Sequence, residues 1–328
     1  MKCLHSPVRR ALGMLALLAA SSLATPATAA YPEQPIRMIV AYGAGGGTDI
    51  VARLLAPYIG KYLGPSASVV VVNRPGAGGA IGFAELAKAT PDGYTVGFIN
   101  TPNVLTIPIE RKAAYHWQDF EVLGNVVDDP GNFSVHADSP FKNLSELVAY
   151  AKSRPGEVTY GSTGVGSDDH LSALMLERAA GIQMTHVPFK GTSEVHNAVL
   201  SKQITVAAMN IGEALQYVKG GSKIRQLGQM SESRSLLAPQ VPTFKEQGYA
   251  IVMASLRGMA APKGLPPAVR DQLVSAVQKA VADPEFQTRA ANVFAPLRYL
   301  PPPAYAAELK EAEAGFQQLW QVMPWGDK

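Results

Sequence analysis

The chain has 328 residues, 47% of them hydrophobic and 17% charged, which excludes a disordered protein. Its formal charge is only +3 and it contains no run of basic residues, so a nucleic-acid partner is not expected. The single cysteine, Cys3, precedes the first apolar segment, so the rest of the chain has no disulfide, cysteine nucleophile or thiolate metal site.

The N-terminal segment predicts export. Three basic residues precede the apolar run ALGMLALLAASSLA, and small residues follow it as far as Ala29. This pattern is typical of a secretory signal peptide, here residues 1–29, and it is too short for a membrane anchor. The pair Arg9-Arg10 leaves twin-arginine export open, although ordinary secretion fits the following residues better. Cleavage near Ala29 removes three basic residues and no acidic one, so the mature chain has balanced charge.

The mature chain alternates short β-rich runs with segments of helical pattern. Strands are expected at residues 36–42, 68–74, 94–100, 133–137, 158–162, 184–189, 204–210 and 249–261. Helices are expected at residues 50–64, 82–89, 144–154, 168–181, 193–202 and 212–221. This alternation predicts βαβ units with parallel sheets between layers of helices. The final part of the chain predicts long helices without intervening strands, at residues 267–283, 284–294 and 303–322.

Two lobes are the simpler organisation for this number of strands, because the βαβ pattern restarts near residue 131. The strand after Gly248 is expected to return the chain to the first lobe. We therefore predict an α/β protein with lobe 1 at residues 30–130 plus 250–328 and lobe 2 at residues 131–249. Each lobe is expected to contain a mainly parallel sheet flanked by helices.

A glycine-rich turn, AYGAGGGTDIVARLL, joins the first expected strand to the first expected helix. A dinucleotide fingerprint counted from Gly43 needs a glycine at its sixth position, but that position is occupied by Thr48. A phosphate-binding loop needs a Gly-Lys-Ser/Thr motif, and none is present. Exposed N–H groups at a helix N-terminus still favour an anion by roughly 0.3–1 kcal/mol. The turn is therefore interpreted as an anion site, with a plain tight turn as the alternative.

A second junction, VTYGSTGVGSDDHLSALM, has the same design. Ser162 and Thr163 add hydroxyl donors beside the glycines. His170 either hydrogen-bonds a ligand or satisfies the turn. Asp168 and Asp169 are interpreted as complementing the helix dipole, with ligand contact the less favoured alternative. Together the two junctions predict a cleft that holds a molecule with a carboxylate at one end or both.

Catalysis is not expected. A nucleophile elbow requires glycine two residues before the serine, but Tyr160 stands there relative to Ser162. The histidines lack the spacing of a metal site, so neither a metal nor a cofactor is predicted. A secreted α/β hydrolase therefore remains only as a less favoured alternative.

Other polar residues lie near the ends of expected strands. Arg74, in a Pro-Gly loop, is interpreted as bracing that loop rather than binding an anion. Thr101 and Asn103 follow the strand at residues 94–100, at the edge where open α/β sheets bind ligands. These two residues are therefore candidates for ligand contact.

Four blocks, in order along the chain, resemble the Bug family, the periplasmic solute-binding proteins of tripartite tricarboxylate transporters. They are YPEQPIRMIVAYGAGGGTDIVARLLA, VVNRPGAGGAIGFAELAKATPDGYT, YGSTGVGSDDHLSALMLERAAGIQMTHVPFKG and APQVPTFKEQGY. The resemblance implies a periplasmic, monomeric binding protein with a two-lobed, type II-like periplasmic-binding-protein fold. Such a protein closes about a hinge on a small mono-, di- or tricarboxylate, held by glycine-loop N–H groups and water, and presents it to membrane permease subunits. A sensor that passes ligand occupancy to a membrane signalling system is the alternative.

The resemblance also implies a set of ligand-binding positions. They are Tyr42, Gly45, Gly46, Thr48, Thr101, Asn103, Ser162, Thr163, Gly166, His170 and Asn210. Two departures from the family pattern stand out: Gly43-Ala44 replaces prolines, which predicts a looser loop, and Met209 replaces a frequent aspartate. The second departure argues against an amino-acid ligand and favours an apolar or aromatic body.

Overall fold

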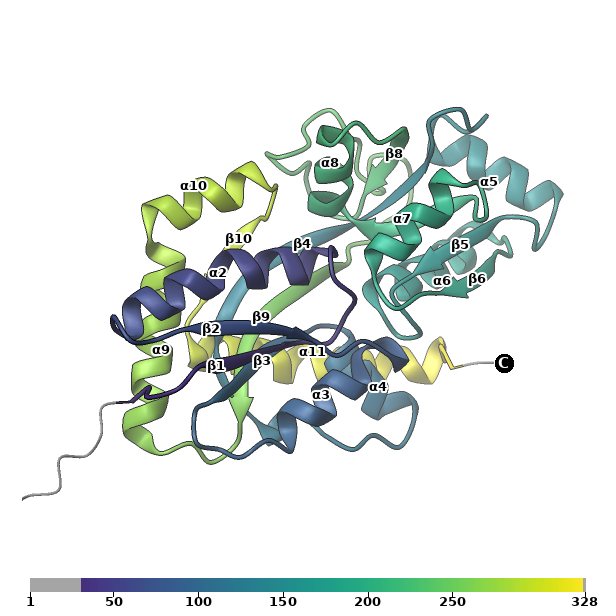
Figure 1. Cartoon of the computed structure of the whole chain (residues 1–328). Helices are drawn as coiled ribbons and strands as arrows, with labels where there is room; N and C mark the ends of the chain where they lie inside the picture. Colours follow the sequence, from purple (N-terminus) through teal and green to yellow (C-terminus); the bar gives the residue numbers. More distant parts are fainter. Residues whose placement is uncertain (1–30, 327–328) are drawn as a thin grey trace, which may run out of the picture.

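The computed structural model describes residues 31–326, so the expected signal peptide lies outside the described residues. The α/β class is confirmed by its elements (Figure 1). The strands are β1 (Ile36–Val40), β2 (Val69–Asn73), β3 (Thr95–Asn100), β4 (Phe120–His136), β5 (Thr159–Ser162), β6 (Thr185–Pro188), β7 (Val206–Asn210), β8 (Ile224–Gln229), β9 (Ala254–Pro262) and β10 (Leu297–Leu300). The helices are α2 (Gly47–Leu63), α3 (Ala80–Ala87), α4 (Asn103–Glu110), α5 (Leu144–Ser153), α6 (Asp168–Ala180), α7 (Thr192–Leu200), α8 (Ile211–Lys219), α9 (Pro267–Ala282), α10 (Pro284–Asn292) and α11 (Pro302–Val322), with short 3-10 turns at Ala77–Gly79 and Trp117–Asp119.

The strands are hydrogen-bonded in two groups. In the first group, β2, β1 and β3 are parallel, but β9 is antiparallel to β3, and β4 and β10 continue the sheet in antiparallel pairs. In the second group, β7, β5 and β6 are parallel neighbours and β4 is antiparallel to β7 and β8. Both groups are therefore mixed, and the expectation of mainly parallel sheets is wrong. Antiparallel neighbours such as β4 and β9 need no crossover helix between them, so the βαβ pattern did not reveal them.

One long strand, β4, belongs to both groups. It pairs with β9 as far as Pro130, and from Gly131 onward it pairs with β7 and β8. β4 and β9 run side by side between the two parts of the molecule (Figure 1). The chain therefore changes its hydrogen-bonding partners at a Pro-Gly step, where a break in a regular ladder is easily accommodated.

The two groups have separate hydrophobic cores. One cluster of buried side chains lies around the first group and includes Ile39, Phe83 and Val277. Another lies around the second group and includes Phe133 and Tyr160. Burial of this kind contributes about 25 cal/mol for each Å² of apolar surface removed from water, so each group has its own source of stability.

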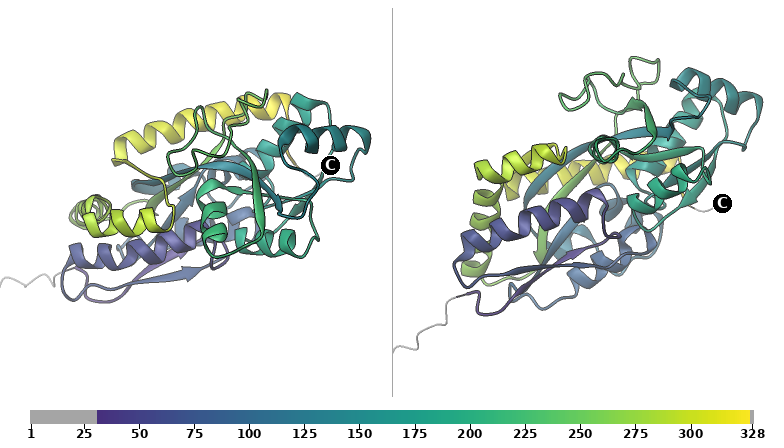
Figure 2. Two further views of the ribbon diagram at one scale, coloured as in Figure 1. Left: turned by 90° about the horizontal axis from the view of Figure 1, so that it is seen from above. Right: turned by 45° about the horizontal axis from the view of Figure 1, so that its top comes forward.

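The C-terminal helix α11 reaches both groups. It packs against α4 and β4, and its end extends toward α6 (Figure 2). There Trp325 is buried against Leu171 of α6, and Arg178 of α6 donates a hydrogen bond to the carbonyl of Val322. None of the helices within residues 31–326 is long and apolar enough to span a bilayer.

Several elements were not expected from the sequence. They are α4, β8, β10 and the first part of β4. The expectation of no strand among the terminal helices is wrong, because β10 pairs with β4 at Val127 and Asn125. A strand of four residues next to prolines is too short to give a period-2 signal.

Candidate functional site

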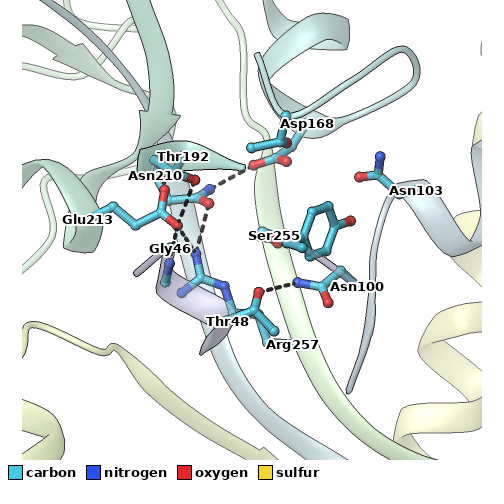
Figure 3. Close-up of a pocket in the computed structure, with 13 residues that line it drawn as sticks. Gly46, Thr48, Asn100, Asn103, Asp168, Thr192, Asn210, Glu213, Ser255 and Arg257 are labelled. Carbon is cyan, nitrogen blue, oxygen red and sulfur yellow. Dashed lines mark hydrogen bonds and ion pairs between the residues drawn. The ribbon is translucent and has the colours of Figure 1, made fainter. Parts of the chain in front are cut away.

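A small cavity lies where the N-termini of five helices, α2, α4, α6, α7 and α8, converge with the ends of β3 and β9 (Figure 3). It is lined by Tyr42, Gly46, Gly47, Thr48, Asn100, Asn103, Thr163, Asp168, Thr192, Asn210, Glu213, Ser255 and Arg257. The space open to the centre of a water molecule is about 20 Å³, which is room for roughly one water molecule. The cavity is therefore almost completely closed.

The structure brings together part of the set of residues expected from the sequence. The expected residues that line the cavity are Tyr42, Gly46, Thr48, Asn103, Thr163 and Asn210. The expected residues that do not line it are Gly45, Thr101, Ser162, Gly166 and His170. The lining residues absent from the expected set are Gly47, Asn100, Asp168, Thr192, Glu213, Ser255 and Arg257. Most of the charge in the cavity therefore comes from side chains that the motifs did not indicate.

The first glycine loop makes its hydrogen bonds to the protein itself. The N–H of Gly45 donates to Asp49 at 2.9 Å, which is a contact within the turn. The N–H of Gly47 donates at 2.8 Å to Oε1 of Glu213, a residue of α8. The anion position at the N-terminus of α2 is thus taken by a carboxylate of the chain, as the dipole of a helix N-terminus favours.

The second glycine loop is also internally bonded. Asp169 accepts from the N–H of Thr163 at 3.2 Å and from its hydroxyl at 3.0 Å. The N–H of Gly164 donates to the hydroxyl of Ser162 at 3.1 Å, and that of Gly166 donates to Nδ1 of His170 at 3.1 Å. These donors are therefore satisfied by the loop itself and by the first turn of α6.

A buried arginine lies at the centre of the site (Figure 3). The Nη2 group of Arg257 donates to Asn210 at 2.9 Å and lies 3.2 Å from a carboxylate oxygen of Glu213 and 3.2 Å from one of Asp129. Its side chain is 3% exposed. Because charges in such a place must be paired, the arginine and the two acids form one interdependent network.

Acidic residues outnumber the basic ones around this network. Asp168 and Asp169, at the start of α6, are buried as well, and Arg257 is the one buried lysine or arginine among residues 31–326. Burial raises the pKa of Asp129 to about 7, in spite of the opposing charge of Arg257. Burial raises the pKa of Asp168 also, and burial together with the charge of Asp168 raises that of Asp169.

These shifts predict that the ligand-free protein is more stable at pH 5 than at pH 8. Between the ordinary pKa of 3.8 and about 7, the folded chain keeps a proton on Asp129 that the unfolded chain has lost. The stabilisation is complete below pH 4 and disappears as the pH rises through 7. We expect the melting temperature to fall by several degrees from pH 5 to pH 8 at constant ionic strength, and Asp129→Asn to flatten this slope. A melting temperature that rises over this interval would contradict the pKa assignment.

His170 lies away from the small cavity and lines a second, larger one beside the C-terminal segment. Its ring is stacked on that of His186, with centroids 4.1 Å apart, and His186 is stacked on Tyr160 at 5.0 Å. Burial, with a contribution from His186, lowers the pKa of His170 to about 3, so the imidazole is neutral. His170 was considered either as a ligand contact or as a residue that satisfies the turn. The structure contains the second arrangement, in which Nδ1 of His170 accepts the N–H of Gly166.

Met209 and Arg74 also lie apart from the cavity. Met209 is completely buried in a cluster with Val195 and Ala214, and its neighbour Asn210 faces the cavity instead, as alternation along a strand requires. The interpretation that Met209 meets an apolar ligand body is therefore wrong. Arg74 pairs with Glu85 at 2.8 Å on the surface.

No cluster of His, Cys, Asp and Glu side chains suited to a metal ion occurs within residues 31–326.

Comparison with known proteins gives consistent matches over the chain. The profile of the family described as "Tripartite tricarboxylate transporter family receptor" matches residues 51–296. The "UPF0065 protein in gbd 5'region" of Cupriavidus necator is 39% identical over 282 residues, which are 84% of this chain and 84% of that protein. The structure of the periplasmic binding protein BugD is 34% identical with a TM-score of 0.84, covering 91% of this chain and 100% of BugD. MatC from Rhodopseudomonas palustris, solved with bound malate, is 25% identical with a TM-score of 0.81, covering 88% of this chain and 99% of MatC.

Proposed function

Because the chain belongs to the tripartite tricarboxylate transporter receptor family, the Bug family, we propose that it captures a small organic carboxylate in the periplasm and delivers it to a membrane permease. Members of this family are receptors, so the protein is a binding protein and not an enzyme. The capture site proposed is the small cavity at the five helix N-termini. The observation that carries the proposal is that both groups of strands contribute walls to this one cavity.

We further propose that residues 30–130 plus 250–328 form one lobe and residues 131–249 the other, with β4 and β9 as the hinge. The change of partners at Gly131 and the separate hydrophobic cores support this division. A solute that touches both lobes only when they are shut shifts the population toward the closed form.

Contacts between the proposed lobes support a closed state. The N–H of Gly43 donates to the carbonyl of Lys190 at 3.1 Å, and the hydroxyl of Ser193 donates to the carbonyl of Ala44 at 3.0 Å. On the other side of the cavity, the hydroxyl of Thr106 donates to the carbonyl of Gly166 at 2.7 Å. With room for roughly one water molecule, the cavity must open before a dicarboxylate enters.

An organic acid as ligand has two further supports. MatC, a relative at 25% identity, was solved with malate. In this chain, Arg257 lines the cavity, and its Nε is a buried donor without a hydrogen-bond partner. A guanidinium N–H that meets no acceptor is a natural place for a carboxylate oxygen.

The test is calorimetry of the mature protein with a panel of mono-, di- and tricarboxylates, followed by small-angle scattering with the compound that binds. We expect saturable binding of one class of carboxylate and a smaller radius of gyration in its presence. Absence of binding by every organic acid, together with turnover of an ester or amide, would overturn the proposal.

A further inference from the structure

We propose that the C-terminal segment Met323–Trp325 is a clasp, which fastens lobe 1 to helix α6 of lobe 2 and raises the population of the closed form. The inference rests on the proposed function, because it uses the same two lobes. It adds a determinant of closure that lies outside the capture cavity, since no residue of the segment lines that cavity. The apparent affinity for a solute scales with the population of the form that holds it, so the clasp also sets how tightly a solute is held.

The first support is a hydrophobic cluster that belongs to both lobes. It joins Met323 and Trp325 of lobe 1 to Leu171 of α6, and the side chains of Trp325 and Leu171 are at most 1% exposed. The partly buried side chains around these three also come from both lobes: Ile109, Phe316, Leu319 and Trp320 from lobe 1, Val165, Leu174 and Met175 from lobe 2, and Met253 beside the hinge strand β9. Separating α6 from the C-terminal segment would expose these apolar surfaces to water, which is unfavourable.

The second support is the contact of Trp325 with the second glycine loop. A Cβ atom added to Gly166 would lie 3.3 Å from Nε1 of Trp325 and 2.7 Å from Oγ1 of Thr106. The hydroxyl of Thr106 also donates to the carbonyl of Gly166 at 2.7 Å. Two side chains of lobe 1 therefore pack against the same glycine of lobe 2. That glycine lies two residues before Asp168, which lines the capture cavity, so the clasp acts on an element of the cavity wall.

The third support is that the rest of the attachment is weak. A second cavity lies between the C-terminal segment and lobe 2, and the space in it open to the centre of a water molecule is about 650 Å³. Leu174 and Met184 line it from lobe 2, and Pro324 lines it from the segment. The hydrogen bond from Arg178 to the carbonyl of Val322 comes from an exposed side chain. The buried indole of Trp325 is therefore the contact on which the clasp depends.

The contact made by Trp325 is apolar. Its Nε1 is buried and has no hydrogen-bond partner within residues 31–326. Trp325→Phe therefore loses no hydrogen bond and keeps an aromatic ring in the cluster, whereas Trp325→Ala removes the ring and leaves a void. These two substitutions distinguish an apolar clasp from any polar role of the indole.

The experiment measures the distance between the lobes in the mature protein, residues 30–328, without solute. Cys3 is the only cysteine of the chain and lies in the expected signal peptide, so two cysteines can be introduced for nitroxide labels. Lys88→Cys, just after α3, and Asn197→Cys, on α7, place one label on an exposed position of each lobe. Double electron–electron resonance then gives the populations of the closed distance, which is that of the present structure, and of any longer one.

We expect the closed distance to predominate in the doubly labelled protein without further change. Trp325→Ala should lower the ratio of closed to open molecules at least tenfold, and Trp325→Phe should keep this ratio within about threefold. Trp117→Ala is the matched control, because Trp117 packs against the core of lobe 1 and its Nε1 donates to Glu313 of α11 at 2.9 Å. It removes the same side chain within lobe 1 alone, so it should leave the ratio unaltered, and thermal melts should show that all variants fold.

Three results would each overturn the clasp. The first is a labelled protein that is already open with Trp325 in place, and the second is a Trp325→Ala variant with an unaltered distribution of distances. The third is equal opening by Trp325→Ala and by either Trp325→Phe or Trp117→Ala. Carboxylate capture would stand after any of these results, because no solute enters the measurement and the calorimetric panel tests capture separately.

Discussion

Replacing Arg257 with methionine is expected to lower the free energy of unfolding by about 3–5 kcal/mol, the usual cost of removing one partner from a buried ion pair. The guanidinium faces Asp129 and Glu213, and all three side chains are at least 94% buried. Methionine occupies much of the same volume but leaves both carboxylates without a cation. Urea denaturation followed by circular dichroism measures the loss directly.

The chain provides a matched control for this substitution. Arg298 also meets two acids, Asp128 at 3.0 Å and Glu308 at 2.7 Å, but its side chain is 43% exposed. Because solvent screens such pairs, Arg298→Met should cost no more than about 1 kcal/mol.

A combined variant separates lost pairing from lost packing. Adding Asp129→Asn and Glu213→Gln to Arg257→Met removes the whole ion network, and this triple variant should recover much of the stability. If Arg257→Met costs no more than Arg298→Met, the buried acids are already neutral and the electrostatic account of the site is incorrect.

Local motifs predicted the elements that begin at a glycine junction. The strand, glycine turn and capped helix around Gly46, and the corresponding set around Thr163, could be located because each signal lies within about fifteen residues of sequence. The structure brings both junctions to one cavity. Their detailed hydrogen bonding could not be predicted, because the donors are satisfied by side chains such as Glu213, far away in the sequence.

The charged centre of the site was missed for a related reason. Arg257 and Glu213 are 44 residues apart, and their pairing exists only in the folded chain. Two signals were nevertheless present. A lone arginine inside the apolar run SLRGMAA must find a partner when that strand is buried. Glu213, three residues after Asn210, completes a capping box at the start of α8.

The long strand β4 illustrates a second limit. Residues 120–132 contain Gly124, Pro130 and Gly131, which in sequence are typical of a loop. In the fold, this segment is a strand because β9 pairs with it along most of its length. Tertiary pairing therefore outweighs local propensity at the position where the chain passes from one group of strands to the other.

Gly47→Ala is expected to weaken solute binding at least tenfold, about 1.4 kcal/mol, while the protein remains folded. A Cβ atom at this position would overlap with the guanidinium of Arg257 and the carboxylate of Glu213. Both groups are ends of flexible side chains, but each is held in the buried ion network, so moving them costs pairing energy. Glu213 belongs to the proposed second lobe, so its overlap with the new Cβ arises only when the lobes shut.

The neighbouring residue is the control for this substitution. Gly46 is extended at φ −82°, a conformation that alanine adopts readily, and the nearest atoms to an added Cβ are 3.7 Å away. Gly46→Ala should therefore bind solute within about twofold of the unmodified protein. Calorimetry gives the affinities, and scattering with saturating solute reports closure. Equal binding by both alanine variants would show that the start of α2 does not contact the second lobe when the lobes close on solute. The hydrogen bond from the N–H of Gly47 to Glu213 would then be structural, without a role in capture.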